Sequence, residues 1–205
     1  MDIFSKGNYK PISSEFRISG IFALEELTKF QDKFDIHDTD TTINSIRDAI
    51  VANYLGYDLL NFDKHGFDAK NSKTNTFLEI KQCSLSSKKL GGTWNDTNEE
   101  KAMAFSDPKL FTVVAVWRGA SDLQFMVYGQ NEKLGKHLYR LVTERKVGSR
   151  STQSIGIEKL IKDFGFSVIC PPDKTKEFIF KLIINYSKSI GAYLDLSKIR
   201  TIQNI

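Results

Sequence analysis

Little in the sequence points to a disulfide-rich, zinc-binding or membrane-spanning protein. Its 205 residues include two cysteines, Cys83 and Cys170, and three histidines. Two cysteines are too few for a disulfide scaffold, and no His and Cys residues cluster at the spacing of a zinc site. No apolar run approaches the ~20 residues that a membrane-spanning helix needs, and the first residues lack the pattern of a secretory signal. We therefore expect a protein of the reducing cytoplasm that does not associate with a membrane.

No internal repeat, low-complexity tract or Gly/Ser/Pro-rich linker divides the chain. The 40% hydrophobic and 26% charged composition is typical of a globular protein with a core of its own, and the length fits one domain. The net charge of +4 is distributed unevenly: residues 1–80 carry −4, residues 81–155 carry +5 and residues 156–205 carry +3. Such a distribution suits a chain that holds a cation in its first part and a polyanion elsewhere, although a surface accident would give the same pattern.

Hydrophobic periodicity predicts the order of helices and strands. Helices are expected at 21–34, 43–55, 98–105, 132–142, 157–164 and 176–187. Strands are expected at 57–62, 66–69, 76–81, 110–117, 123–128 and 166–170. This pattern predicts an α/β (α+β) fold in which helices flank a central mixed sheet of about five strands.

Three charged residues of a predicted hairpin are the most informative in the chain. Glu79 and Lys81 lie two positions apart on one strand, so their side chains leave the same face. Asp68 lies on the preceding strand, and a turn at 71–75 would bring it back beside Glu79. Asp68, Glu79 and the backbone carbonyl of Ile80 offer the hard oxygen ligands that Mg²⁺ prefers.

This arrangement suits phosphodiester hydrolysis. A bound Mg²⁺ lowers the pKa of water and offsets charge on a phosphate oxygen. Lys81 would orient or help deprotonate the water and stabilise the transition state. The alternative for Glu79 and Lys81 alone is a surface ion-pair ladder.

Asp48 is a fourth candidate for the metal site. It lies on the predicted helix at 43–55, on the side marked by apolar residues at i+3, i+4 and i+7. Burying an unpaired carboxylate is costly, so an acid in this position is expected to reach toward the metal. The alternative is a boundary residue paired with Arg47 or Lys64.

Residues 66–69 (GFDA), 77–82 (FLEIKQ) and 47–60 (RDAIVANYLGYDLL) together resemble the signature of the PD-(D/E)XK nuclease superfamily, which includes most type II restriction endonucleases. By this resemblance Asp68 and Glu79 match the two motif acids and Lys81 the motif lysine. Phe67 stands where the motif has proline. Asp48 lies where many members carry an acid in their first core helix.

The resemblance covers about residues 43–128 and implies a restriction-endonuclease-like catalytic core. We expect a single nuclease domain over 1–205, in which 129–205 contributes to DNA recognition. The implied activity is Mg²⁺-dependent cleavage of double-stranded DNA to 5′-phosphate and 3′-hydroxyl ends. The resemblance further implies a prokaryotic cytoplasmic enzyme that forms a homodimer on a palindromic site.

Two polar, basic segments at 84–97 and 145–154 are expected to contact the DNA. Hydroxyls and lysines suit phosphates, and Asn, Arg and Gln side chains suit base edges. The residues expected to contact DNA are Gln82, Lys88, Lys89, Thr93, Trp94, Asn95, Arg145, Lys146, Ser149, Arg150, Thr152 and Gln153. Gln82 is included through the resemblance, in which some members place a polar residue there near the scissile phosphate. Alternatives are a core or loop anchor for Trp94 and a solvated loop at 145–154.

The sequence therefore predicts a type II restriction endonuclease. One alternative keeps the fold but acts on DNA structure, as a resolvase or repair nuclease does. Another is a non-catalytic DNA-binding protein. The basic loop rich in Arg, Ser and Gln favours reading of base sequence.

Overall fold

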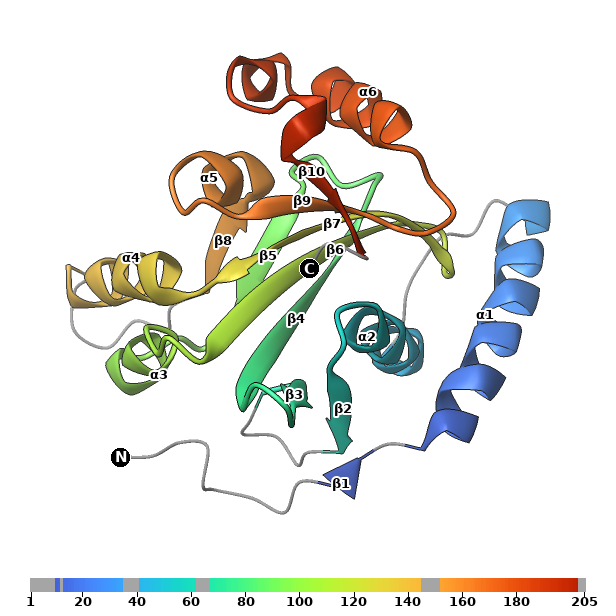
Figure 1. Ribbon diagram of the computed structural model, residues 1–205, viewed down its shortest axis with the longest axis horizontal. Helices are drawn as coiled ribbons and strands as arrows, with labels where there is room; N and C mark the ends of the chain where they lie inside the picture. Colours follow the sequence, from blue (N-terminus) through green and yellow to red (C-terminus); the bar gives the residue numbers. More distant parts are fainter. Residues whose placement is uncertain (1–9, 12, 35–40, 62–66, 145–151, 203–205) are drawn as a thin grey trace.

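A mixed sheet runs through the middle of the molecule (Figure 1). The computed structural model describes residues 10–11, 13–34, 41–61, 67–144 and 152–202. In order across the sheet, the strands are β1 (Lys10–Pro11), β2 (Asp58–Asn61), β3 (Ala69–Asn71), β4 (Thr76–Ser84), β6 (Leu110–Arg118), β7 (Asp122–Gln130), β9 (Ser167–Cys170) and β10 (Ile199–Thr201). The β4–β6 and β9–β10 pairs are parallel and the other pairs are antiparallel.

The sheet is larger than the expected five strands. It has eight strands, or seven without the two-residue β1. The expected number was too low because β1 and β10, with two and three residues, are too short to show an alternating pattern.

Helices cover both faces of the sheet. They are α1 (Ser14–Phe34), α2 (Thr41–Tyr54), α3 (Glu99–Ala104), α4 (Glu132–Thr143), α5 (Ile157–Lys162) and α6 (Lys176–Tyr186), followed by the 3₁₀ helices η2 (Lys188–Ala192) and η3 (Leu196–Lys198). All six helices were expected, but α1 begins at Ser14 rather than at 21, and α5 ends at Lys162. Among the described residues, no helix is both long enough and apolar enough to cross a membrane.

The two faces of the sheet belong to two separate hydrophobic clusters. Helices α1 and α2 contribute Leu24 and Val51 to one cluster, together with Leu78 and Ile80 of β4. Helices α3 to α6 lie over the other face, where Phe77 of β4 belongs to the second cluster (Figure 1). The expectation that one face of β4 is outside the core is therefore wrong. Strand β4 is covered on both sides, as is usual for a strand in a parallel pair between helical layers.

A second sheet pairs two segments that were expected to be loops. Strand β5 (Gly91–Trp94) runs antiparallel to β8 (Gln153–Gly156). A Cβ atom on Gly91 would lie 2.2 Å from the Ile155 carbonyl oxygen, so this close approach of the two backbones requires glycine.

The β3–β4 hairpin confirms the expected neighbourhood of Asp68 and Glu79. Its turn is held by the Asn71 carbonyl oxygen Oδ1, which accepts hydrogen bonds from the backbone N–H groups of Lys73 and Thr74. Ala69 pairs with Leu78 in the ladder, so the preceding residue, Asp68, reaches the level of Glu79.

Candidate active site at the edge of strand β4

Asp68 lies immediately before β3, where its carboxylate continues the hydrogen bonding of that strand. Its backbone N–H donates to the Leu78 carbonyl at 3.0 Å. Its Oδ2 atom accepts from the backbone N–H of Ile80 at 2.6 Å. Within the described ranges β4 has no strand partner on this edge beyond Leu78, so a side chain takes the place of a backbone carbonyl.

The Ile80 carbonyl leaves β4 toward this same edge. The N–H and C=O groups of one strand residue point to the same side, and those of its neighbours point to the other. Phe77, an odd-numbered residue, donates its N–H to Lys109 on the β6 side. The Ile80 carbonyl therefore points away from β6 and toward Asp68, as the sequence-based proposal for a metal ligand requires.

Glu79 and Lys81 form a short ion pair on the face of β4 that carries Phe77. The distance from Lys81 Nζ to Glu79 Oε1 is 2.5 Å, and Glu79 is 8% exposed. Strand β5 packs over the lysine, because a Cβ atom on Gly92 would lie 3.2 Å from Lys81 Cγ. Burial lowers the pKa of Lys81, but the charges of Glu79 and Asp68 outweigh it and hold this pKa above its ordinary value. Lys81 is thus an ammonium at neutral pH.

Asp48 approaches from α2, on the other face of the sheet. Val51 and Ala52 are fully buried on this side of α2, and they carry the half-buried Asp48 against β4. The Gln82 side chain donates a hydrogen bond from Nε2 to Asp48 Oδ1. Burial raises the pKa of Asp48 to about 7, although the hydrogen bond from Gln82 and the charge of Lys81 act in the opposite direction.

A chain of contacts fixes the orientation of Gln82. The indole N–H of Trp117 donates to Gln82 Oε1, and an indole can only donate. The amide nitrogen of Gln82 must therefore face Asp48. The Arg47 guanidinium lies over the Trp117 ring at 5.0 Å and bonds the carbonyls of Gly119 and Ala120. This places Gln82 between Asp48 and Trp117 on the α2 face, away from the face of Lys81.

The charges of this cluster do not balance. Asp48, Asp68 and Glu79 act on one another, with Lys81 as the ammonium among them. Burial, and then the charges of Glu79 and Asp48, hold the pKa of Asp68 well above its usual range. A further cation would relieve this repulsion, and oxygen donors at the edge of a sheet suit Mg²⁺. The residues present therefore fit the expected metal.

The carboxylates are not yet arranged as a complete ligand set. Across the described ranges, no three His, Cys, Asp or Glu side chains converge as metal ligands. Asp68 bonds the Ile80 backbone, Glu79 bonds Lys81 and Asp48 bonds Gln82. The four expected catalytic residues are gathered at one place, and each carboxylate is occupied by a neighbour from the chain itself.

The expected DNA-contacting residues have different outcomes. Five of them are exposed: Lys88, Lys89, Thr93, Asn95 and Thr152. Gln153 is half-buried at the start of β8. Trp94 is 1% exposed and belongs to the hydrophobic core, so the expectation that it contacts DNA is wrong and the core-anchor alternative holds. Arg145, Lys146, Ser149 and Arg150 lie outside the described residues, as does Lys64, a considered partner of Asp48.

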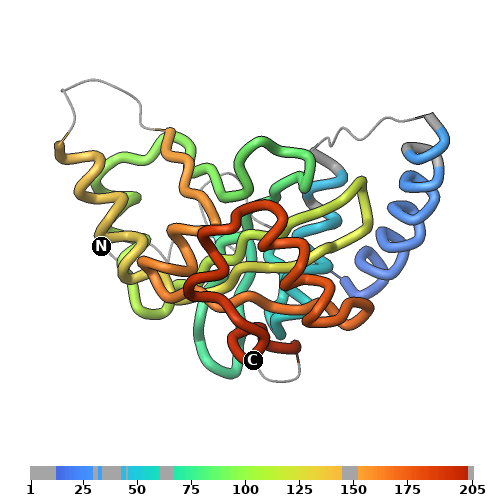
Figure 2. Tube along the Cα trace, turned by 90° about the horizontal axis from the view of Figure 1, so that it is seen from above, coloured from blue at the N-terminus to red at the C-terminus, as the bar shows by residue number. Residues whose placement is uncertain are grey.

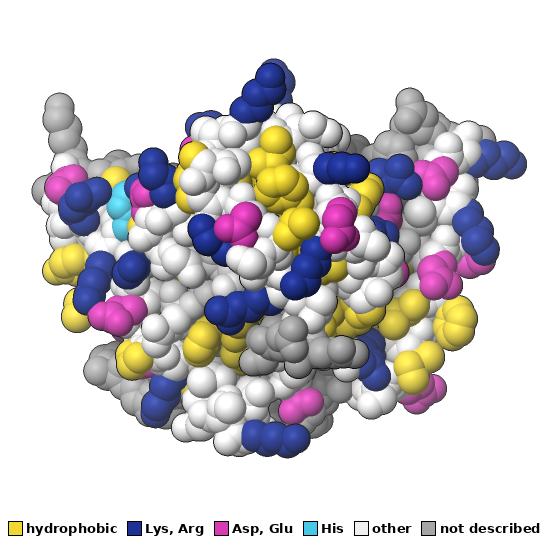
Figure 3. Space-filling view, turned by 45° about the horizontal axis from the view of Figure 1, so that its top comes forward, with side chains coloured by type: hydrophobic (Ala, Val, Ile, Leu, Met, Phe, Trp, Pro, Cys, Tyr) yellow, Lys and Arg dark blue, Asp and Glu magenta, His cyan; other side chains and the backbone are white. Residues whose placement is uncertain are grey.

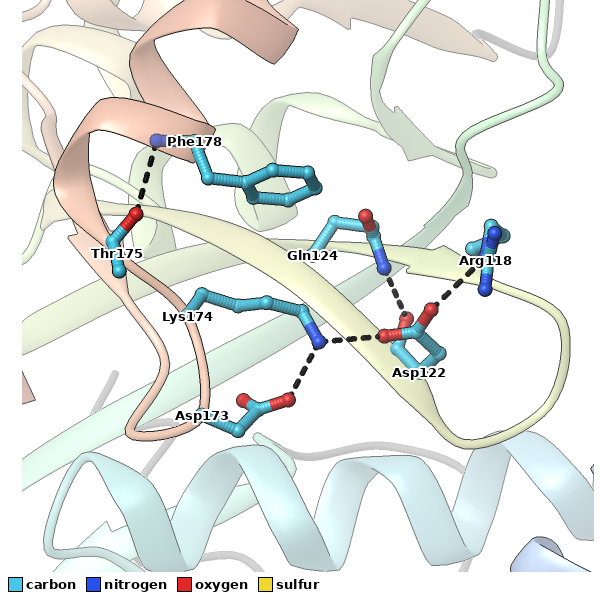
Figure 4. Close-up of a pocket in the computed structure, with 7 residues that line it drawn as sticks. All are labelled: Arg118, Asp122, Gln124, Asp173, Lys174, Thr175 and Phe178. Carbon is cyan, nitrogen blue, oxygen red and sulfur yellow. Dashed lines mark hydrogen bonds and ion pairs between the residues drawn. The ribbon is translucent and has the colours of Figure 1, made fainter.

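A pocket of about 410 Å³ lies apart from the carboxylates, between the β6–β7 turn and the start of α6 (Figure 4). Its charged groups are paired: Lys174 Nζ lies 2.9 Å from Asp122 and 2.5 Å from Asp173, and Arg118 Nε lies 3.0 Å from Asp122. None of the expected site residues lines it.

Arg47 and Trp117 are parts of the site that the sequence did not suggest. Trp117 was assigned only to a core strand, and Arg47 was considered only as a partner of Asp48. Alternation along β4 does offer one signal, because it places Gln82 on the opposite face from Lys81. Comparison with protein-family models finds no match, and comparison with curated proteins finds no similar sequence.

Proposed function

We propose that this protein is a Mg²⁺-dependent endonuclease of double-stranded DNA. The observation that carries the proposal is the gathering of Asp48, Asp68, Glu79 and Lys81 at the edge of β4 that β3 leaves uncovered. Buried carboxylates with raised pKa values beside a lysine are a costly arrangement in a purely structural role. The resemblance of these same residues to the PD-(D/E)XK signature supports the same activity.

In the proposed reaction each residue has a distinct part. Mg²⁺, held by Asp68, Glu79 and the Ile80 carbonyl with Asp48 nearby, would activate water and offset charge on the phosphate. Lys81, as an ammonium, donates a hydrogen bond and stabilises the charge that develops on the phosphate oxygens. Its raised pKa argues against a role as the base. Exposed Lys88 and Lys89 would bind backbone phosphates.

Among nucleases, we propose a type II restriction enzyme that acts in a prokaryotic cytoplasm as a homodimer and leaves 5′-phosphate and 3′-hydroxyl ends. A structure-specific nuclease of the same fold is the second candidate. Both use the same four residues, and they differ in what the DNA surface recognises.

Digestion of a sequenced phage DNA with and without Mg²⁺, followed by mapping of the fragment ends, tests the proposal. A defined banding pattern that requires Mg²⁺ is the expected result. Selective cutting of branched substrates would favour the second candidate. DNA binding without any Mg²⁺-dependent cleavage would overturn the catalytic assignment.

Trp117→Phe is expected to weaken Mg²⁺ binding about 10-fold, which is the usual scale for loss of a group that orients a metal ligand. The phenylalanine keeps the packing but removes the donor that orients Gln82 toward Asp48. Calorimetric titration with Mg²⁺ measures the effect. Trp94→Phe is the matched control, because the Trp94 indole N–H is buried without a hydrogen-bond partner among the described residues. Equal affinities in the two variants would show that the Trp117 contact does not position Asp48.

A further inference from the structure

Helix α1 presents an apolar surface to the solvent. Four of the nine large hydrophobic side chains that are exposed in the described residues lie in its first half: Phe22 (65%), Ile18 (50%), Phe16 (41%) and Ile21 (36%). Figure 3 shows hydrophobic side chains gathered on the right-hand side of the molecule, where α1 lies. The other five are spread over the rest of the described chain. An exposed apolar group of this kind marks an interaction site.

The opposite side of α1 is fixed to the body of the protein, so the helix cannot turn to bury Phe22. Leu24 is 1% exposed, and a Cβ atom on Gly20 would lie 2.7 Å from the Ile46 side chain. The Thr28 and Ser121 hydroxyls are 2.5 Å apart, which ties α1 to the β6–β7 turn. Phe22 is two positions from both Gly20 and Leu24, and so faces away from them. Figure 2 shows α1 at the outer side of the molecule.

The charges along this outward face are complementary to a second, antiparallel copy of themselves. Glu15 and Lys29 each lie seven residues from Phe22, which is about two helical turns, so all three share one side of the helix. In an antiparallel pair with a two-fold axis at Phe22, Glu15 of each helix meets Lys29 of the other. In a parallel pair, like charges would meet at the same level.

We propose that α1 is the self-association surface of this protein, and that two copies pair antiparallel about Phe22. Ile18 packs beside the two Phe22 rings, and the Glu15 and Lys29 side chains pair at both ends. Arg47, which neighbours Asp48 on α2, bonds the β6–β7 turn that α1 also contacts, so the pairing would set the relative placement of two catalytic sites. The pairing itself needs neither DNA nor Mg²⁺, and it stands or falls independently of the proposed nuclease activity.

Sedimentation equilibrium of the full chain, without DNA or Mg²⁺, tests the surface. The unaltered protein is expected to be a dimer. Phe22→Glu places two carboxylates at the axis and is expected to weaken the dimer at least about 30-fold, the effect of losing a central interface residue. Phe178→Glu is the matched control, because Phe178 is 45% exposed on α6 and its change should leave the dimer intact. Circular dichroism checks that both variants fold.

Charge reversal tests the antiparallel register. Glu15→Lys and Lys29→Glu are each expected to weaken the dimer a few-fold, on the scale of exposed ion pairs, and the double variant should restore it. A monomeric unaltered protein would overturn the proposal, whether residues 1–9 or another molecule cover α1. A dimer that is insensitive to Phe22→Glu would also overturn it. Failure of the double variant to restore association would overturn the antiparallel register.

Discussion

Lys81→Gln is expected to lower the rate of DNA cleavage by at least about 1,000-fold, the scale of losing one preorganised charge donor at a reacting centre. Lys81 is the ammonium among Glu79, Asp68 and Asp48, and its raised pKa keeps it charged at neutral pH. Glutamine retains most of the stem that packs under Gly92 but carries no charge. Single-turnover cleavage at saturating Mg²⁺, together with a DNA-binding assay, separates loss of chemistry from loss of binding.

Two further variants distinguish a catalytic lysine from a structural ion pair. Lys81→Arg keeps a positive charge beside Glu79, so it should preserve folding, but its planar guanidinium does not replace a point charge at the phosphate. We expect it to be stable and inactive. Lys70→Gln is the control from the same hairpin, because Lys70 lies over the Phe77 ring at 5.4 Å and has no place in the cluster. Cleavage by Lys81→Arg at the unaltered rate would reduce the pair to an ion-pair ladder.

The part of the site that the sequence predicted is the part built by local contacts. The turn at 71–75 and the alternation of β4 are both visible in the sequence, and together they bring Asp68 to the level of Glu79. The helix position of Asp48 is likewise visible in the apolar spacing around it. A hairpin needs no information from distant residues, so its register follows from the turn.

The part that was missed depends on contacts between distant residues. Trp117 meets Gln82 across 35 positions, and Arg47 meets the Ala120 carbonyl across 73. No spacing rule connects such residues, and a buried arginine stacked on tryptophan has no sequence pattern of its own. The β5–β8 pair was missed for the same reason, because Gly91 and Gly92 show no strand periodicity until β8 is beside them.

Asp48→Asn is expected to stabilise the metal-free protein at pH 8 by on the order of 2 kcal/mol, since a tenfold change in the proton affinity of a group corresponds to about 1.4 kcal/mol. The pKa of Asp48 is about 7 in the folded chain, against 3.8 for an ordinary aspartate. Between these values the folded chain retains a proton that the unfolded chain has released. The stability from this group is therefore complete below pH 3.8 and is lost as the pH rises through about 7. Asparagine stays neutral and can still accept the hydrogen bond from Gln82.

Chemical denaturation at pH 4 and pH 8 measures this difference. The variant and the unaltered protein should be equally stable at pH 4 and should diverge at pH 8. Asp58→Asn, at an exposed carboxylate at the start of β2, should change stability little at either pH. A variant that is no more stable than the unaltered protein at pH 8 would mean that Asp48 is not a strained carboxylate.

Addition of Mg²⁺ turns the same measurement into a test of why the strain is present. A cation that binds the folded state alone stabilises it in proportion to the logarithm of its concentration over Kd. At pH 8 we expect Mg²⁺ to stabilise the unaltered protein and to stabilise Asp48→Asn much less, so that their order reverses at high Mg²⁺. A purely structural carboxylate would show the gain in the variant at every Mg²⁺ concentration. Reversal would mean that the chain gives up stability at Asp48, Asp68 and Glu79 in order to bind the metal.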